Sequence, residues 1–261
     1  MTFSNEQFQL NSKVAIVTGA GGRGNSIGRA YALGLAQAGA RVVVADLNEA
    51  GAKAVADEIT ASGGQAVAIR VDIGDSQSTQ SMVEQTVQAY GGVDILVNNA
   101  ALMVELGSEQ AVDMDIDQWT KILDINLTGA LRCVQAAVPE MRKRRGGRII
   151  NQVSGGAFPA GSVYGISKLA LHGLTTTLAR QLGRDKITVN SIAPGNVRSD
   201  AGKELVPDDS PFLQFLSMTV AMRAQGEPDE LVGPLLMLCS SAGEWVTGQV
   251  LHVDGGWVMT P

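Results

Sequence analysis

The chain contains few of the residues that build metal centres, disulfides and aromatic surfaces. Two histidines, two cysteines and 4% aromatic residues are spread over 261 positions. His172 and His252 lie far apart without the spacing of zinc ligands, so we expect no metal site. Cys133 and Cys239 stand among apolar neighbours outside any C-x-x-C pair, which favours buried free thiols in a reducing compartment.

The chain also lacks the signals of membrane and nucleic-acid proteins. No run reaches the ~18 apolar residues of a membrane span, and the first eleven residues are polar, unlike a secretory signal. A net charge of −6 argues against a nucleic-acid surface. The basic run Arg142–Arg145 is typical of a solvated helix end. We expect a cytoplasmic protein that binds neither nucleic acid nor membrane.

What the chain does have is a regular alternation of two patterns. Short apolar runs alternate with helix-like segments, which predicts a parallel sheet covered by helices on both faces. Strands are expected at residues 14–17, 41–45, 66–71, 93–97, 148–153, 187–192 and 249–253. Helices are expected at residues 26–38, 48–62, 75–91, 117–142, 163–182 and 229–239. The predicted fold is α/β, a doubly wound Rossmann-type sheet in a single domain at 13–261 after a tail at 1–12.

The region at 198–227 is the irregular part of this pattern. It is rich in large apolar side chains, namely Phe212, Leu213, Phe215, Leu216, Met218 and Met222. Long loops in compact domains are usually functional. We expect one or two short helices that cover an apolar, cyclic or aromatic substrate. The alternative is that these side chains only pack the loop against the core.

A glycine-rich turn runs from Thr18 to Gly28, between the first strand and the first helix. Such turns let the backbone approach a pyrophosphate at a helix N-terminus. Asp46 ends the second strand, where a carboxylate can bind ribose hydroxyls and repel a 2′-phosphate. This favours NAD over NADP, although Arg23 could bind that phosphate. The alternatives are an ordinary tight turn and a helix-capping aspartate.

Tyr164 and Lys168 are one helical turn apart on one face of a predicted helix. An ammonium beside a phenol favours the phenolate. Lowering the pKa of the phenol from ~10 to ~7 needs about 4 kcal/mol of differential stabilisation. Tyr164 would then exchange protons at neutral pH. Taken alone, the spacing is common on solvated helices.

Several motifs occur together in the order of the short-chain dehydrogenase/reductase family, which the chain resembles from about residue 13 to 256. They are Thr18-Gly19, Ile27-Gly28, Asn98-Asn99-Ala100, Ser154, Tyr164 with Lys168, and Pro194-Gly195. The resemblance implies that Tyr164 is the acid/base and that Lys168 lowers its pKa and binds the nicotinamide ribose. It further implies that Ser154 binds the substrate oxygen and that Asn126 holds a relay water.

The same resemblance implies a set of cofactor-binding positions. Asn98 and Ala100 would line the adenosine half, Asp72 would contact the adenine amino group, and Val197 and Ser199 would bind the carboxamide. The full expected set is Gly19, Ser26, Ile27, Gly28, Asp46, Asp72, Asn98, Ala100, Tyr164, Lys168, Pro194, Gly195, Val197 and Ser199.

Three features depart from the family pattern. The glycine turn is three residues longer than usual, with Ser26 replacing the middle glycine, and so resembles the enoyl-thioester reductase branch. The four-residue spacing of Tyr164 and Lys168 instead favours the main carbonyl/alcohol branch. Ala101 replaces a glycine. Ser154 precedes Tyr164 by only ten residues, a shortening that could widen the substrate mouth.

The sequence therefore predicts an oxidoreductase that transfers a hydride between NAD(H) and a secondary alcohol or ketone. The main alternative is an NADPH-dependent 3-oxoacyl-thioester reductase, which cofactor kinetics would distinguish. A cofactor-binding sensor without turnover is a third hypothesis, which the complete Ser154, Tyr164, Lys168 and Asn126 set disfavours. The resemblance also implies a homotetramer or dimer that packs through the helices at 117–142 and 163–182.

Overall fold

A seven-stranded parallel sheet forms the centre of the protein. The computed structural model describes residues 4–22, 24–103, 111–158, 161–207, 209–222 and 225–259. Within these residues the strand order is β3-β2-β1-β4-β5-β6-β7, and each neighbouring pair is parallel. The strands are β1 Val14–Thr18, β2 Arg41–Asp46, β3 Gln65–Arg70, β4 Ile95–Asn98, β5 Gly147–Gln152, β6 Ile187–Pro194 and β7 Val250–Val253. The predicted doubly wound fold is confirmed.

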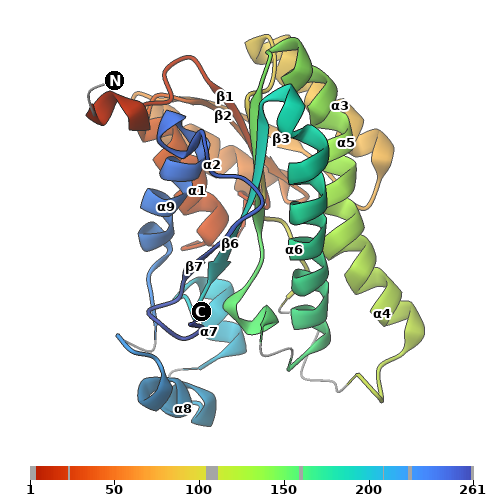
Figure 1. The fold of residues 1–261 in the computed structure, drawn as a ribbon, viewed down its shortest axis with the longest axis vertical. Helices are drawn as coiled ribbons and strands as arrows, with labels where there is room; N and C mark the ends of the chain where they lie inside the picture. Colours follow the sequence, from red (N-terminus) through yellow and green to blue (C-terminus); the bar gives the residue numbers. More distant parts are fainter. Residues whose placement is uncertain are drawn as a thin grey trace.

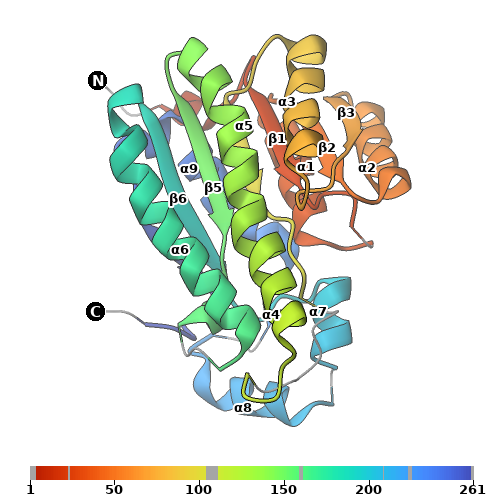
Figure 2. The same cartoon turned by 90° about the vertical axis from the view of Figure 1, so that its right-hand side faces the viewer.

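Helices cover both faces of the sheet (Figures 1 and 2). One face carries α1 (Ile27–Gln37), α2 (Glu49–Ala61) and α9 (Val232–Cys239); the other carries α3 (Ser76–Tyr90), α5 (Gly129–Lys143) and α6 (Val163–Leu182). Short 3₁₀ helices join these elements, namely η1 Asn5–Phe8, η4 Gly155–Ala157, η5 Gly183–Asp185, η6 Pro228–Leu231 and η7 Ser241–Gly243. This layering confirms the expected alternation of strands and helices.

Polar side chains fix where several helices begin. Each accepts hydrogen bonds from the free N–H groups of the first helical turn. The capping side chains are Ser26 for α1, Asn48 for α2, Asp75 for α3 and Ser162 for α6. Helix α6 has the predicted bounds. Ser162 Oγ accepts from Gly165 N at 3.0 Å and so caps α6.

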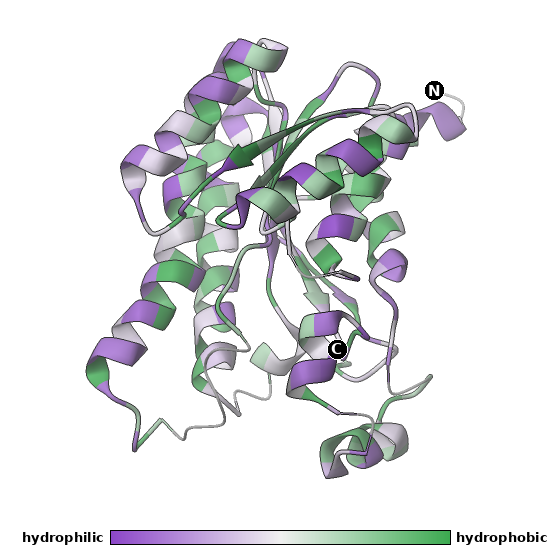
Figure 3. Cartoon of the chain, turned by 180° about the vertical axis from the view of Figure 1, so that it is seen from behind, coloured by the Kyte–Doolittle hydropathy of each residue, from purple (hydrophilic) through white to green (hydrophobic). Residues whose placement is uncertain are grey.

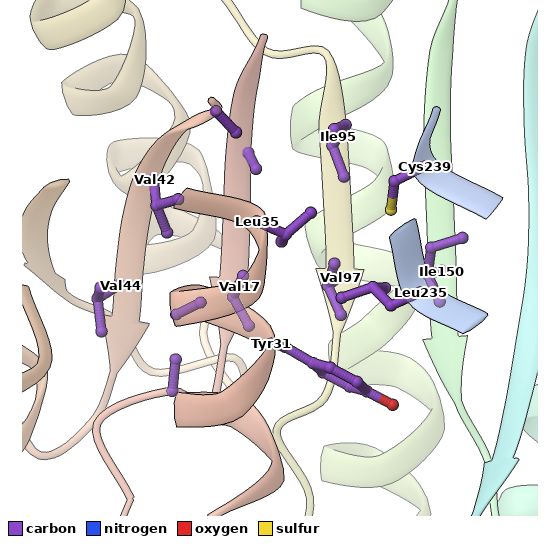
Figure 4. Close-up of a cluster of buried hydrophobic side chains, with 14 of the residues drawn as sticks. Val17, Tyr31, Leu35, Val42, Val44, Ile95, Val97, Ile150, Leu235 and Cys239 are labelled. Carbon is purple, nitrogen blue, oxygen red and sulfur yellow. The ribbon is translucent and has the colours of Figure 1, made fainter. Parts of the chain in front are cut away.

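The core consists of branched apolar side chains on both faces of the strands. Figure 4 shows Val17 and Val97 of the sheet beside Leu35 of α1, and Ile150 beside Leu235 of α9. A second cluster fills the space under α3, α5 and α6. The covering helices carry alternating hydrophobic and hydrophilic stripes (Figure 3). Two-sided burial explains why the strands are apolar runs and not alternating patterns.

The expected helix at 117–142 is present, but a π turn divides it into two α-helices. Helix α4 (Ile116–Leu123) runs into the π turn η3 (Asp124–Thr128), which leads into α5. Propensity and periodicity do not reveal a π turn, since it adds one residue within a continuous helical ladder. The last expected helix is likewise split between the 3₁₀ turn η6 and α9.

The region at 198–227 contains two short helices, as predicted. They are α7 (Asp200–Leu205) and α8 (Pro211–Thr219), which lie together beyond one end of the sheet (Figures 1 and 2). Among the described residues of α8, only Leu216 is buried, while Phe212 and Phe215 are 43% and 49% exposed. Packing against the core therefore accounts for Leu216 but not for these two rings.

The residues before β1 pack against the domain. Leu10 is buried in the core, and its N–H donates to the carbonyl of Ala38 at 2.8 Å. Ser241 Oγ donates to the carbonyl of Gln7 at 3.0 Å. The domain boundary at residue 13 stays a prediction. No helix among the described residues is long and apolar enough to cross a membrane.

A buried polar network crosses the sheet between β4 and β6. Asn98 Nδ2 donates to Asn151 Oδ1 at 2.8 Å, and Asn151 Nδ2 donates to Thr175 Oγ1 at 2.9 Å. Thr175 Oγ1 also accepts from Ser191 Oγ at 2.9 Å and donates to the carbonyl of Leu171 at 3.0 Å. The network ties α6 to the strands that precede and follow it.

Replacing Thr175 with valine should destabilise the protein by about 1–3 kcal/mol, because it leaves the buried Asn151 amide without its acceptor at constant volume. Urea unfolding measures this change. Thr60→Val is the matched control: Thr60 is exposed near the end of α2, its hydroxyl donates within its own helix, and the substitution should shift the free energy of unfolding by less than about 0.5 kcal/mol. Equal effects of the two substitutions would contradict a stabilising network.

Candidate active site

A cleft of about 850 Å³ opens at the carboxyl ends of the strands. It spans the junction of β1 and β4, where the strand order reverses, the usual ligand position in doubly wound sheets. Its lining includes most predicted site residues, namely Gly19, Ser26, Ile27, Gly28, Asp46, Asp72, Ala100, Ser154, Tyr164, Lys168, Pro194 and Ser199. The structure thus brings together residues that are up to 180 positions apart.

Four predicted site residues do not line this cleft. The Asn98 side chain points into the polar network, and Asn126 is 1% exposed behind the cleft wall. Val197 is buried and pairs with Gly226 in an isolated bridge. Gly195 faces a second hollow of about 500 Å³ on the β7 side. Backbone groups of these residues could still contact a cofactor, but their side chains do not face the cleft.

The glycine turn is pressed against neighbouring backbone. Gly19 has a φ of +68°, and a Cβ there would lie 2.7 Å from Ala100 Cα. A Cβ at Gly28 would lie 2.2 Å from the carbonyl oxygen of Gly19. Only glycine fits both positions. Ile27 and Gly28, the first residues of α1, line the cleft, which places a helix N-terminus there, as an anion site requires.

Thr18 and Asn99 lock this turn to the end of β4. Thr18 Oγ1 accepts from the N–H groups of Asn99 and Ala100, both at 3.2 Å. Asn99 Nδ2 donates to the carbonyls of Thr18 and Gly19, both at 3.0 Å. Asn99 was not among the predicted site residues, although its place in the Asn98-Asn99-Ala100 motif was the available signal.

Other cleft residues were also missing from the predicted set. They are mostly apolar or follow strand ends, namely Gly22, Leu47, Asn48, Val71, Ile73, Ala101, Leu102, Met103, Lys121, Ile125, Gln152, Val153 and Ala201. Position directly after a strand could have indicated Leu47, Val71 and Val153. Nothing in the sequence pattern distinguishes the others. Arg23 and residues 159–160 of the shortened loop lie outside the described residues.

Asp46 lies at the rim of the cleft with both carboxylate oxygens engaged. Oδ2 accepts from Gly21 N and Oδ1 from Asn48 N, each at 2.9 Å. A carboxylate has lone pairs for further donors, so these bonds orient Asp46 without exhausting it. Asn48, not Asp46, caps α2. The structure therefore removes the helix-capping interpretation of Asp46.

Tyr164 and Lys168 lie together in the cleft. Lys168 Nζ is 5.6 Å from the centroid of the Tyr164 ring and donates to the carbonyl of Gln152 at 2.9 Å. Burial lowers the pKa of Lys168 from 10.5 to about 7. Burial also raises the pKa of Tyr164, opposite to the predicted direction. Burial removes the water that would stabilise the phenolate of Tyr164. Lys168 does not offset this effect, because burial also disfavours its ammonium form.

Ser154 follows β5 and opens η4. Its Oγ accepts from Gly156 N at 3.2 Å. A hydroxyl carries one donor and two acceptor sites, so the Ser154 proton is left to donate into the cleft. Ser199 also lines the cleft, and its Oγ accepts from Gly202 N at 2.9 Å to cap α7.

Asn126 sits in the π turn and connects three elements. Its Oδ1 accepts from Leu102 N at 2.8 Å, and Nδ2 donates to the carbonyl of Leu102 at 3.1 Å and to Ser167 Oγ at 3.0 Å. Ser167 Oγ in turn donates to the carbonyl of Tyr164 at 2.7 Å. Asn126 thus ties the cleft wall at Leu102 to the first turn of α6. Within the described chain, no group of three or more histidine, cysteine, aspartate or glutamate residues could hold a metal ion.

Known proteins are similar to this chain in sequence and in architecture. A family described as "Enoyl-(Acyl carrier protein) reductase" matches residues 22–258. An uncharacterized oxidoreductase of Mycobacterium tuberculosis is 44% identical over 96% of this chain and 99% of its own. Human dehydrogenase/reductase SDR family member 4 is 35% identical over 95% of this chain and 88% of its own. This chain belongs to the short-chain dehydrogenase/reductase family. It is therefore an oxidoreductase by family.

Solved structures of the family superpose closely on the fold. A 7α-hydroxysteroid dehydrogenase complexed with NADH and 7-oxo glycochenodeoxycholic acid has a TM-score of 0.91 and 36% identity, covering 99% of both chains. A gluconate 5-dehydrogenase from Burkholderia cenocepacia, in complex with NADP and tartrate, has a TM-score of 0.89 and 31% identity, covering 97% of both. The two neighbours thus carry different nicotinamide cofactors.

The buried lysine should make stability depend on pH. Between about pH 7 and 10.5 the unfolded chain holds a proton on Lys168 that the folded chain has released. The free energy of unfolding therefore rises with pH across that window. Relative to Lys168→Met, the wild type should gain about 3 kcal/mol between pH 7 and 9.5.

Urea unfolding at matched pH values measures this difference. Lys121→Met is the control, because it removes an exposed ammonium at the same cleft. A wild-type advantage over Lys168→Met that stays constant from pH 7 to 9.5 would show that burial does not perturb this lysine.

Proposed function

We propose that this protein is an NAD-dependent dehydrogenase that interconverts secondary alcohols and ketones. The observation that carries the proposal is the meeting of Ser154, Tyr164 and Lys168 in the same cleft as the glycine turn and Asp46. Nucleotide-binding and proton-transfer groups thus share one space. The NADH complex of the 7α-hydroxysteroid dehydrogenase supports this assignment.

The cleft fits a dinucleotide along its length. The close-packed Gly19–Gly28 turn and the start of α1 suit the pyrophosphate, and Asp46 suits the ribose hydroxyls. When protonated, Lys168 Nζ has three protons and uses one on the Gln152 carbonyl, so two remain for a second ribose and for Tyr164. When bound, the nicotinamide accepts or returns the hydride.

The side chains supply proton transfer and oxyanion stabilisation. Tyr164 Oη would take the hydroxyl proton of the alcohol, while Ser154 Oγ–H donates to the same oxygen. A lysine with a pKa of about 7 exists in both protonation states near neutral pH. It can therefore pass a proton between Tyr164 and solvent. Asn126 and Ser167 hold the backbone that orients Tyr164.

A second candidate is an NADPH-dependent 3-oxoacyl-thioester reductase. The NADP complex of the gluconate 5-dehydrogenase and the acyl-carrier-protein description of the matching family favour it. The Asp46 carboxylate at the cleft rim opposes it, because it would repel a 2′-phosphate. Comparing kcat/KM for NAD⁺ and NADP⁺ with one alcohol separates the two candidates.

We also propose that the protein is a homo-oligomer. Helix α6 leaves part of one side uncovered in a single chain: Leu169 is 42% exposed, and a Cβ at Gly173 would meet nothing within 4 Å. Small and apolar residues on an uncovered helix suit close helix–helix contact. Light scattering after size-exclusion chromatography would give the subunit number.

Tyr164→Phe should lower kcat/KM by about 10²–10⁴-fold, since it removes the acid/base group and keeps the ring. NADH affinity, measured by fluorescence titration, should change by less than about threefold if only proton transfer is lost. Tyr90→Phe, on a half-exposed tyrosine remote from the cleft, is the control. A Tyr164→Phe enzyme within tenfold of the wild type would rule out the mechanism.

Asp46→Ser should raise the ratio of kcat/KM for NADP⁺ to that for NAD⁺ by about tenfold or more, because a 2′-phosphate no longer meets a carboxylate. Asp57→Asn removes an exposed carboxylate of α2 and should leave the ratio unchanged. A wild type that already prefers NADP⁺ would overturn the NAD assignment and favour the second candidate.

A further inference from the structure

The C-terminal tail brings a tryptophan to the catalytic serine. A Cβ added at Gly155 would lie 3.2 Å from Trp257 Cε3, and one at Gly156 would lie 3.7 Å from Cη2. Gly155 directly follows Ser154, and Gly156 N donates to Ser154 Oγ. The six-membered ring of Trp257 therefore rests on the two glycines that shape the serine turn. A Cβ at Gly155 would require the ring to shift by a few tenths of an ångström, whereas one at Gly156 would make an ordinary van der Waals contact.

Asp254 fixes the tail in this position. Its Oδ1 accepts from Gly256 N at 2.9 Å and Trp257 N at 3.3 Å, and its Oδ2 accepts from Val258 N at 2.9 Å. The Asp254 side chain is 4% exposed. Three backbone bonds to one buried carboxylate make a rigid turn at the end of β7. These bonds hold the backbone at Trp257 in place beside the turn that follows β5.

Helix α8 adds a second ring at the same place. The Phe212 and Trp257 centroids are 6.2 Å apart with planes at 72°, and Phe215 stacks on Phe212 at 6.5 Å. Two rings at nearly right angles form a corner in which a third ring can lie on one face and meet the other edge-on. Phe212 is 43% exposed and Trp257 only partly buried, so apolar surface remains for a ligand.

Helix α8 and the C-terminal tail are also joined by a backbone hydrogen bond. Met222 N, just after α8, donates to the carbonyl of Gly255 at 2.9 Å. Three separate segments therefore meet at one aromatic surface. They are the turn at Ser154–Gly156, helix α8 and the tail that carries Trp257. Exposed apolar area beside a polar reaction centre is typical of a binding pocket for an apolar ligand.

We propose that Trp257 and Phe212 form the wall that selects secondary alcohols and ketones whose reacting carbon lies in, or next to, a six-membered ring. The proposal rests on the proposed function and specifies the substrate class of that same site. The ring packs in the Trp257–Phe212 corner while the substrate oxygen faces Ser154 and Tyr164. Acyclic short-chain alcohols would lack this contact.

The test compares cyclohexanol and 1-phenylethanol with 2-butanol in the wild type, Trp257→Ala, Trp257→Phe and Phe212→Ala. Trp257→Ala and Phe212→Ala should raise KM for the ring-bearing alcohols by about tenfold or more. The loss for 2-butanol should be under threefold, and KM for the cofactor should change by less than twofold. Trp257→Phe should restore most of the ring preference.

Trp245→Ala is the matched control, because Trp245 is 95% exposed and precedes β7, whereas Trp257 follows that strand. It should behave as the wild type. Equal loss of activity for ring-bearing and acyclic alcohols in Trp257→Ala would overturn the proposal and assign Trp257 to support of the serine turn. A changed subunit number in that variant would overturn it in favour of a subunit contact. A wild type that oxidises none of these alcohols with either cofactor would instead refute the proposed function itself.

Discussion

The hydrogen bonds between Thr18 and Asn99 are the contact on which the site depends. They join the turn after β1 to the turn after β4, at the only place where neighbouring strands of the described sheet lead their chains in opposite directions. The cleft exists because the backbone separates there. The same bonds press Gly19 onto Ala100, so the nucleotide side of the cleft is defined by backbone packing and not by mobile side chains.

The cleft contains one buried and one partly buried ionisable group, Lys168 and Tyr164, and burial of Lys168 costs stability below its ordinary pKa of 10.5. Burial disfavours the ammonium of Lys168 and the phenolate of Tyr164 alike, so the neutral forms of both are favoured. A cationic ligand beside them would shift Tyr164 back toward the phenolate. The protonation states of Tyr164 and Lys168 therefore depend on the ligand that binds beside them. Groups with perturbed pKa values are typical of reaction centres.

Local chemistry explains what the sequence could predict, and long-range packing explains what it could not. Strand positions, the bounds of α6 and the proximity of Tyr164 and Lys168 follow from periodicity, capping and helical spacing. The direction of the Asn98 side chain depends on Asn151, 53 residues away, and the pKa of Tyr164 depends on burial by several elements. Neither the direction of the Asn98 side chain nor the pKa of Tyr164 can be predicted from a local sequence pattern. The corner formed by Trp257 and Phe212 beside Ser154 likewise requires the tail, helix α8 and the turn after β5 to meet.

The π turn at Asp124–Thr128 has an evolutionary consequence. Deleting one residue there would leave a continuous α-helix with every backbone bond intact, so the local chain would tolerate it. It would also rotate α4 against α5 by about 100°, the angle of one helical residue. Asn126 would then leave Leu102, and the wall of the cleft would lose its anchor. Selection should therefore preserve the length of this helix more strictly than the identity of its outward-facing residues.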